Sequence, residues 1–285
     1  MDYIFSLSSK SGHIICPNCK KKTLKPYINN ATGLNAGDKY GRCERINSCT
    51  YDLRPKKDKN ESWQKTEIKP IEVKPIEFID SEIVQKTFNN FKENVFFMYL
   101  VKIFGRDKAF ELQSTYNIGT ARNGGTIFWQ QDVNGLFRTG KVFYYQKNGK
   151  RNKYFGSWFI HTKIRADFNF QQCFFGLHLT NENKAVALCE SEKTAIMMSV
   201  YEPDYIWVAS GGSEMINLNR LVELKRLDIV YPDNLQAEKW LQKTKLFQNR
   251  KMDYTVDAAV NSGQLDAGSD ILDLYLLKNQ IMETK

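Results

Sequence analysis

Four of the six cysteines form two pairs near the start of the chain. Cys16 and Cys19 make a Cys-x-x-Cys pair, and Cys43 and Cys49 make a wider pair after an interval of 23 residues. This layout can bring four thiolates to one tetrahedral zinc ion, because short knuckles turn both pairs toward the same point. A lone Cys-x-x-Cys could be a redox motif, but the second pair favours a structural zinc ribbon within residues 1–55.

A second set of residues that could do chemistry consists of acids that follow apolar runs. Glu190 follows the run 185–189, and Asp233 follows the run 227–231. Parallel strands present their carboxyl ends at one edge of a sheet, so both carboxylates are expected on the same rim. Oxygen ligands of this kind bind Mg²⁺ or Mn²⁺ and support phosphoryl or nucleotidyl transfer. Acids are also common as helix caps, and from spacing alone that interpretation stays open. Two further acids come later in the chain, Asp270 and Asp273.

A sheet with intervening helices is needed to position these acids, and residues 184–247 show that alternation. Apolar runs predict strands and periodic segments predict helices, while Pro203 and Pro232 end elements and Gly211-Gly212 marks a turn. Strands that alternate with helices imply right-handed crossovers and a parallel sheet, so the fold class of this part is α/β. Lys193 begins a helix, where contact with a phosphate is expected. The predicted strands are 185–189, 205–209 and 227–231, and the predicted helices are 192–201, 216–224 and 235–247.

The order of these motifs resembles the Toprim domain of bacterial replicative primases. In that family an apolar strand ends in Glu, a glycine turn and a strand ending in Asp-x-Asp follow, and a late segment contains Asp. The family's glutamate and aspartates hold Mg²⁺, so the resemblance implies that role for Glu190, Asp233 and Asp270, with catalysis also involving Lys193. It implies a Toprim-like domain over residues 183–285. The matching segments are Val-Ala-Leu-Cys-Glu190, Ala-Ser-Gly211-Gly212, Val-Tyr-Pro-Asp233 and Gly268-Ser-Asp270-Ile-Leu-Asp273.

The chain departs from the family pattern at three positions. Ser191 stands where the family has glycine, Thr194 where an aspartate is common, and Leu235 at the second aspartate of Asp-x-Asp. The change at Leu235 removes one possible metal ligand, and the exposed-looking Glu238 is one turn further on. These departures keep open a protein that retains the ancestry without the activity.

Charge is distributed unevenly along the 285 residues, whose net charge is +9. Residues 1–57 hold 11 Lys/Arg against 4 Asp/Glu, and residues 101–165 hold 12 against 3. Basic segments next to aromatic residues are typical of single-stranded nucleic-acid binding, although a generally Lys-rich protein would show similar counts. The candidate contacts are Lys20, Lys21, Lys22, Lys25, Tyr27 and Arg42 in the zinc ribbon, and Arg138, Lys141 and Lys153 further along.

Between the two ends lie a predicted linker, residues 56–80, and a basic α+β subdomain, residues 81–182. Prolines within 55–75 favour an extended tether. The subdomain shows helical spacing over 81–102 and 107–113, then strands 126–130 and 136–145 around the turn Asn134-Gly135. In order and character it resembles the amino-terminal part of the primase polymerase domain, so the resemblance covers nearly the whole chain.

Taken together, the resemblance implies a primase-like enzyme that joins nucleotides on single-stranded DNA, with structural zinc and with Mg²⁺ or Mn²⁺. Similar zinc-plus-Toprim proteins occur on mobile elements of Bacteroidota, which implies nucleotides and a helicase or relaxase as further partners. No apolar run reaches the length of a membrane span, so a cytoplasmic protein is expected. A DNA-binding module without turnover and a Toprim nuclease remain alternatives, since the residue pattern does not separate synthesis from cleavage.

Overall fold

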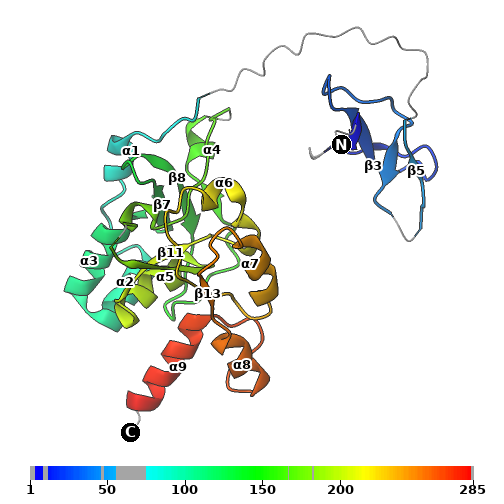
Figure 1. Ribbon diagram of the computed structural model, residues 1–285. Helices are drawn as coiled ribbons and strands as arrows, with labels where there is room; N and C mark the ends of the chain where they lie inside the picture. Colours follow the sequence, from blue (N-terminus) through cyan, green and yellow to red (C-terminus); the bar gives the residue numbers. More distant parts are fainter. Residues whose placement is uncertain are drawn as a thin grey trace. The chain divides into compact units, whose positions relative to one another are not determined.

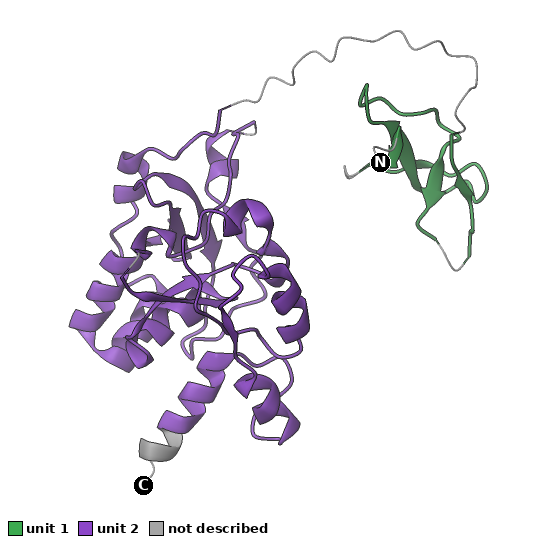
Figure 2. Ribbon diagram, viewed as in Figure 1, with its two compact units in different colours: residues 1–73 green, residues 74–285 purple. Residues whose placement is uncertain are grey.

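The computed structural model describes residues 4–8, 12–45, 48–55, 75–165, 167–181 and 183–283. The chain divides into two compact units, residues 1–73 and 74–285 (Figure 2). Most of the predicted linker, residues 56–74, lies outside the described residues. Its last part belongs to unit 2, because the Ile79 backbone pairs with Phe137 and Glu77 accepts from Arg165. The domain boundaries placed at residues 55, 80 and 182 stay predictions.

Unit 1 is a small antiparallel sheet around a core that contains all four paired cysteines. The long central strand β3 pairs with β1 on one side and β4 on the other, and β2 also pairs with β3. Leu24 is fully buried beside the thiols. Such a core is too small to stabilise a fold by hydrophobic burial alone. The strands are β1 (Phe5–Leu7), β2 (Ile14–Ile15), β3 (Lys22–Asn29), β4 (Gly41–Cys43) and β5 (Asp52–Leu53).

The first part of unit 2 is an antiparallel four-stranded sheet with helices (Figure 1). The predicted helix 81–102 is two helices, because the chain turns at Asn90, whose φ is 50°. The predicted hairpin is confirmed, with Gly135 at φ 79° in its turn. The elements are α1 (Ser81–Gln85), α2 (Val95–Phe104), α3 (Arg106–Tyr116), β6 (Ile118–Thr120), β7 (Thr126–Gln131), β8 (Phe137–Phe143), β9 (Trp158–Phe159) and α4 (His161–Ile164).

The second part of unit 2 is a four-stranded sheet in which every pair of neighbouring strands is parallel, in the order β11-β10-β12-β13. The alternation of strands and helices predicted from the sequence is therefore confirmed. Short 3₁₀ turns, Leu177–Leu179 and Ser213–Met215, flank it. The elements are β10 (Ala185–Cys189), α5 (Glu192–Tyr201), β11 (Tyr205–Ala209), α6 (Leu218–Leu221), β12 (Ile229–Val230), α7 (Ala237–Lys243), β13 (Lys251–Met252), α8 (Thr255–Asn261) and α9 (Ile271–Glu283).

One hydrophobic core joins the two sheets of unit 2. Phe128 of β7 and Trp207 of β11 belong to the same cluster of buried residues. Phe175 forms a two-way backbone bridge with Ala209 at 3.0 Å, and the Tyr116 hydroxyl donates to the Trp207 carbonyl. The continuous core fixes the antiparallel sheet against the edge of the parallel sheet, so side chains from both can line one pocket.

Candidate functional site

The four paired cysteines of unit 1 converge as the spacing predicts. Their sulfur atoms all lie within 4.8 Å of one another, with 3.7 Å between Cys16 and Cys49 and 3.9 Å between Cys19 and Cys43. A tetrahedron with Zn–S bonds of about 2.3 Å has sulfur atoms roughly 3.8 Å apart. The Lys21 backbone N–H lowers the pKa of Cys19 to about 6, which favours the thiolate that a metal requires. The donor set therefore fits a structural zinc ion.

The predicted nucleic-acid contacts of unit 1 differ in exposure. Lys20, Lys21 and Lys22 are exposed and Lys25 is half-buried. Tyr27 is 7% exposed, and its hydroxyl donates to Asp52. Stacking of a base on Tyr27, as the sequence suggested, is therefore wrong, because the ring packs inside the ribbon.

Arg42 is exposed but is held by the same carboxylate as Tyr27. Its Nε donates to Asp52 Oδ2 at 2.9 Å, and this contact raises the arginine's pKa. An exposed ion pair of this kind contributes little free energy. Arg42 therefore remains a candidate phosphate contact, and a phosphate would replace Asp52 as its partner.

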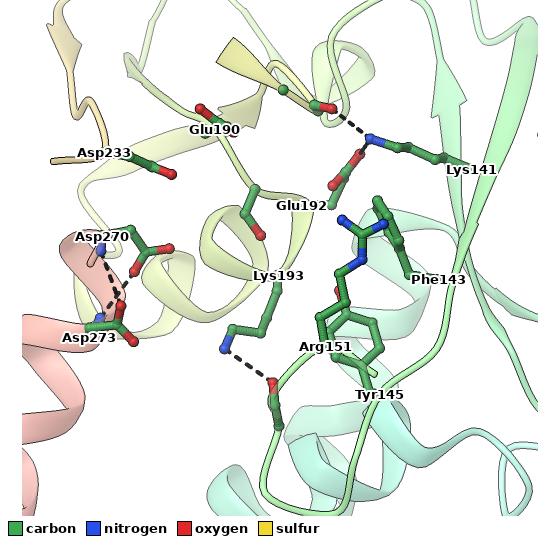
Figure 3. Close-up of a pocket in the computed structure, with 14 residues that line it drawn as sticks. Lys141, Phe143, Tyr145, Arg151, Glu190, Glu192, Lys193, Asp233, Asp270 and Asp273 are labelled. Atoms are coloured by element: carbon green, nitrogen blue, oxygen red, sulfur yellow. Dashed lines mark hydrogen bonds and ion pairs between the residues drawn. The ribbon is translucent and has the colours of Figure 1, made fainter. Parts of the chain in front are cut away.

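In unit 2 a pocket of about 310 Å³ brings together side chains from both sheets (Figure 3). Asp233, Asp270 and Asp273 lie on one side, and cationic and aromatic residues lie on the other, where Glu192 is next to Lys141. All four residues predicted for catalysis are among the lining residues, namely Glu190, Lys193, Asp233 and Asp270. The remaining lining residues are Lys141, Phe143, Tyr145, Gly149, Arg151, Ser191, Glu192, Gly211, Gly212 and Asp273.

Parallel strand ends position the first two acids. Glu190 follows β10 directly, and Asp233 follows β12 after the buried Pro232. Because β10 and β12 are parallel neighbours, both side chains reach the same rim.

The loop that carries Asp233 is tied to the loop that carries Asp270. The Asn234 backbone N–H donates to the Ser269 carbonyl at 3.0 Å, and the Asn234 side chain accepts from the Gly268 N–H at 3.2 Å. Asp257 of α8 completes the tie, because it accepts from the Asn234 amide at 2.8 Å. These bonds hold the acid-bearing loops at a fixed separation.

Asp270 and Asp273 also cap helix α9. The Asp273 N–H donates to Asp270 and the Asp270 N–H donates to Asp273, both at 3.1 Å. This reciprocal pattern is a capping box. Asp270 in addition accepts from the Thr194 hydroxyl at 2.5 Å. The capping interpretation that spacing left open therefore applies to this pair. Both residues also line the pocket, and a carboxylate oxygen that accepts one hydrogen bond has a second lone pair.

The Asp233 carboxylate is electrostatically uncompensated. Among the described residues none donates a hydrogen bond to it, and burial together with Asp270, Glu190 and Asp273 raises its pKa to about 8. Burial also raises the pKa of Glu190 and of Asp270, with neighbouring acids adding to the effect. Carboxylates that share a site without a compensating cation disfavour one another's charged form, and this raises their pKa values. A bound divalent cation would supply the missing charge.

Lys141 and Glu192 form a buried ion pair on the opposite side. Lys141 Nζ donates to the Gly211 carbonyl at 2.5 Å and lies 3.7 Å from Glu192 Oε1. Glu192 is only 3% exposed. A Cβ on Gly211 would lie 2.9 Å from Glu192 Oε1, and its φ is +75°, so the glycine turn found in the sequence is required here.

Arg151 and Lys193 are two further cations that line the pocket, across from Asp233 and Asp270 (Figure 3). The Arg151 guanidinium lies 4.0 Å from the Phe143 ring centre, and Lys193 Nζ donates to the Gly149 carbonyl at 3.2 Å. In the part of the chain that the structure describes, neither has an ion-pair partner, so both can donate hydrogen bonds to phosphate oxygens. The Phe143 stack orients the flat guanidinium for that contact.

Arg138 is a correction to the predicted DNA contacts. It is 9% exposed, and its Nε donates to Asp132 at 2.7 Å while a terminal nitrogen reaches Glu223 at 3.4 Å. Positions 138 and 141 differ by an odd number in β8 and face opposite sides of the sheet. Arg138 therefore joins the hairpin to the segment after α6, and Lys141 lines the pocket. Lys153 is exposed, and its contact with DNA stays a prediction.

Leu235 is also a correction, because it does not project toward the acids. Its side chain is 81% exposed and is absent from the pocket lining, and its φ is +65°. Its N–H donates to Asp257 at 2.8 Å. Glu238, the possible substitute, is exposed and also outside the lining.

We expect Leu235→Asp to leave metal affinity unchanged and Leu235→Asn to stabilise the protein. Leucine is strained in the left-handed region, whereas asparagine is tolerated there, so the gain in unfolding free energy should be about 0.5–1 kcal/mol. Chemical denaturation measures it. Exposed Leu218→Asn in α6, where φ is helical, is the matched control and should give no gain.

The pH dependence of stability follows from Asp233. Because its folded pKa of about 8 exceeds the ordinary value of 3.8, the folded state holds its proton more tightly than the unfolded state. Stability without added divalent cation is therefore expected to fall as pH rises from about 4 to 8. Asp233→Asn should raise the unfolding free energy at pH 9 by on the order of 1–3 kcal/mol and change little at pH 4. A shift that is equal at both pH values would contradict this.

Several pocket residues were not predicted as site residues from the sequence, among them Asp273, Arg151, Tyr145 and Glu192. Asp273 had a recognisable signal, the Asp-x-x-Asp pattern before an apolar run. Arg151, Tyr145 and Glu192 had none, because they reach the pocket only through the packing of the two sheets.

Comparisons with known proteins give two family matches. Residues 2–64 match a zinc beta-ribbon finger, in agreement with the cysteine cluster. Residues 94–234 match a domain of unknown function (DUF6371). This range includes the basic pocket residues Lys141, Arg151 and Lys193 together with Glu190 and Asp233. No curated protein matches the chain in sequence.

Three solved structures illustrate the similarity to primases. The primase fragment of the bacteriophage T7 primase-helicase is 16% identical, with 89% of this chain and 95% of that chain covered and a TM-score of 0.37. The zinc-binding and RNA polymerase domains of the Aquifex aeolicus primase are 15% identical, with 70% of this chain and 55% of that chain covered and a TM-score of 0.32. A DNA primase domain from Pseudomonas aeruginosa is 12% identical, with 65% of this chain and 67% of that chain covered and a TM-score of 0.29. At these scores the function has to be argued from the pocket itself.

Proposed function

We propose that the pocket of unit 2 binds a hydrated Mg²⁺ or Mn²⁺ and transfers nucleotidyl groups on single-stranded DNA, as a Toprim-like primase does. The observation that carries the proposal is the Asp233 carboxylate, which has no donor among the described residues, faces three other acids and has its pKa raised to about 8. Leaving such a group uncompensated costs stability, which is typical of sites that are selected for a ligand.

Each wall of the pocket has a part in this function. Glu190 and Asp233 would hold the cation, with Asp270 close by, and a bound cation would neutralise and orient phosphate oxygens. Arg151 and Lys193 face the acids across the pocket and would bind the phosphates of a nucleotide. The reacting phosphate would then lie between opposite charges that are fixed before it binds, which is how phosphoryl-transfer sites stabilise developing charge.

The spacing of the acids suits a hydrated ion. In the described part of the chain, the cysteine cluster is the one group of three or more metal-ligating side chains that are close enough together to hold an ion. The pocket acids are thus further apart than a fully protein-bound ion needs, and Mg²⁺ ordinarily keeps several waters and substrate oxygens. The same observation favours a second candidate, a DNA-binding module without turnover.

A template-extension assay separates the candidates. The zinc-loaded protein is incubated with an unlabelled single strand, labelled nucleotides and Mg²⁺ or Mn²⁺, and products are resolved on a gel. New labelled oligonucleotides that require the template are the expected result. In a parallel reaction with end-labelled template and unlabelled nucleotides, shortening of the template would indicate the Toprim nuclease. No metal-dependent product in either reaction would favour the binding module.

The setting that fits this function is replication or transfer of a mobile genetic element in the cytoplasm, with single-stranded DNA, nucleotides and a helicase or relaxase as partners. None of the helices among the described residues has the length and hydropathy of a membrane-spanning segment.

A further inference from the structure

An exposed aromatic side chain lies on a basic segment beside the pocket. Tyr154 is 89% exposed and the adjacent Phe155 is 48% exposed. Leaving an aromatic ring this far in water gives no burial energy, so the exposure has to be explained by something other than packing. Residues 138–165 contain eight Lys/Arg and no Asp/Glu.

Ring contacts and hydrogen bonds hold the segment that carries Tyr154 in place. Phe155 packs on Tyr144 with ring centres 4.9 Å apart, and Tyr154 meets Phe155 edge-on at 5.2 Å. The Tyr154 N–H donates to the Asn152 side chain at 3.1 Å. The Tyr144 hydroxyl in turn accepts from Trp158 at 3.3 Å. The contact with Phe155 restricts the orientation of the Tyr154 ring, while most of the ring surface stays open to a ligand.

The same segment continues into the pocket wall. Tyr145 and Arg151 are joined by an antiparallel bridge, and between them the turn closes with the Gln146 N–H donating to the Lys150 carbonyl at 2.8 Å. Gly149 has φ +76°, and a Cβ there would lie 2.5 Å from the Tyr99 ring, so the turn is locked against helix α2. Tyr145, Gly149 and Arg151 line the pocket. A ligand on Tyr154 is therefore within a few residues of the reaction site.

The segment that carries Tyr154 also holds positive charge without local compensation. Lys147, Lys150 and Lys153 are exposed, and across the described ranges no carboxylate forms an ion pair with them. Proteins hold single strands by placing cations along the phosphate backbone and an aromatic ring beside them. An unpaired base can stack on that ring, whereas the bases of a duplex are already stacked on one another.

From this geometry we infer that residues 147–155 form a docking surface for a single-stranded nucleic acid, in which one base stacks on Tyr154 and the lysines contact the flanking phosphates. The inference rests on the proposed function only for the choice of DNA as the natural strand. The chemistry is shared by DNA and RNA, so both are used in the test. A strand bound in this way would run from Tyr154 toward Arg151 and the pocket.

The test is the affinity of the full zinc-loaded chain for labelled dT20 and rU20, measured by fluorescence anisotropy at several salt concentrations. Tyr154→Ala is expected to weaken binding of the preferred strand by about 5- to 100-fold at unchanged salt dependence, since it removes a stacked base and no charge. Tyr154→Phe should stay within about twofold of wild type. Lys153→Gln should lower the slope of log affinity against log salt by about 1.

A matched control is Tyr254→Ala, which removes a tyrosine that is 48% exposed next to helix α8 and outside the pocket lining. It should bind as wild type does. Thermal melting checks that each variant is folded. Equal affinities for wild type and Tyr154→Ala would overturn the inference, as would equal losses for single strands and a matched duplex.

Failure of this inference and failure of the proposed function give different results. If Tyr154→Ala weakens binding but no variant supports template-dependent synthesis, the docking surface stands and the transfer reaction does not. If synthesis occurs and Tyr154→Ala neither weakens strand binding nor raises the template concentration needed for half-maximal rate, the pocket stands and the docking surface is wrong.

Discussion

Glu190→Gln or Asp233→Asn is expected to lower metal-dependent nucleotide transfer by at least about 10³-fold, while single-strand affinity stays within about twofold. Each variant removes one of the two strand-end carboxylates that would bind the cation, and a neutral amide is a much weaker ligand for Mg²⁺ or Mn²⁺. Neither removes a contact that supports the fold. Metal-free Asp233→Asn should be at least as stable as wild type, because repulsion among the acids is relieved.

The matched control for this prediction is Asp253→Asn. Asp253 follows β13 as Asp233 follows β12, but it accepts from the Thr255 N–H at 2.9 Å and does not line the pocket. Its neutralisation should leave the rate of transfer within about twofold. If Asp253→Asn and Asp233→Asn reduced the rate equally, the effect would belong to strand-end acids in general and the assignment of the pocket would fail.

Cys43→Ser is expected to abolish zinc binding and the fold of unit 1. The cysteine cluster is the core of that unit, and a structural zinc in a small ribbon supplies on the order of 10 kcal/mol of folding free energy. Metal analysis should find one zinc per chain in the wild type and less than about 0.1 in the variant. Limited proteolysis should then cleave residues 1–55 rapidly and leave unit 2 resistant.

Cys173→Ser is the control for zinc binding. Cys173 is a buried thiol in unit 2, and burial raises its pKa to about 12, so it remains a neutral thiol and not a metal ligand. The variant should keep one zinc per chain even if its stability falls. A wild-type zinc content well below one, or an unchanged content in Cys43→Ser, would refute the ribbon.

The sequence allowed β10, α5 and β11 to be predicted with correct bounds, because each is a run of apolar residues closed by an acid, a proline or a glycine turn. β12 is shorter than the predicted strand 227–231, since only Ile229 and Val230 pair with neighbours on both sides. Apolar residues predict where a strand can form. The length of the observed strand depends on where the adjacent strands end, because only residues that pair with them belong to the sheet.

Three residues show why the site could be predicted only in part. The burial of Arg138 follows from Asp132 and Glu223, of which the second is 85 residues away along the chain. The outward direction of Leu235 follows from a positive φ that no leucine would suggest. Arg151 faces the acids because one core joins the two sheets. Long-range packing of this kind leaves no local pattern in the sequence, whereas the cysteine spacing and the strand-end acids are themselves local patterns.

The most direct test of the metal site is a calorimetric titration of the zinc-loaded protein with Mn²⁺, comparing wild type with Glu190→Gln. We expect about one Mn²⁺ per chain to bind the wild type with a measurable heat, and binding to weaken by at least about tenfold in the variant, because one of the carboxylates that face the ion is gone. Identical titrations of the two proteins would contradict the account, because the pocket acids would then serve as caps and not as a cation site.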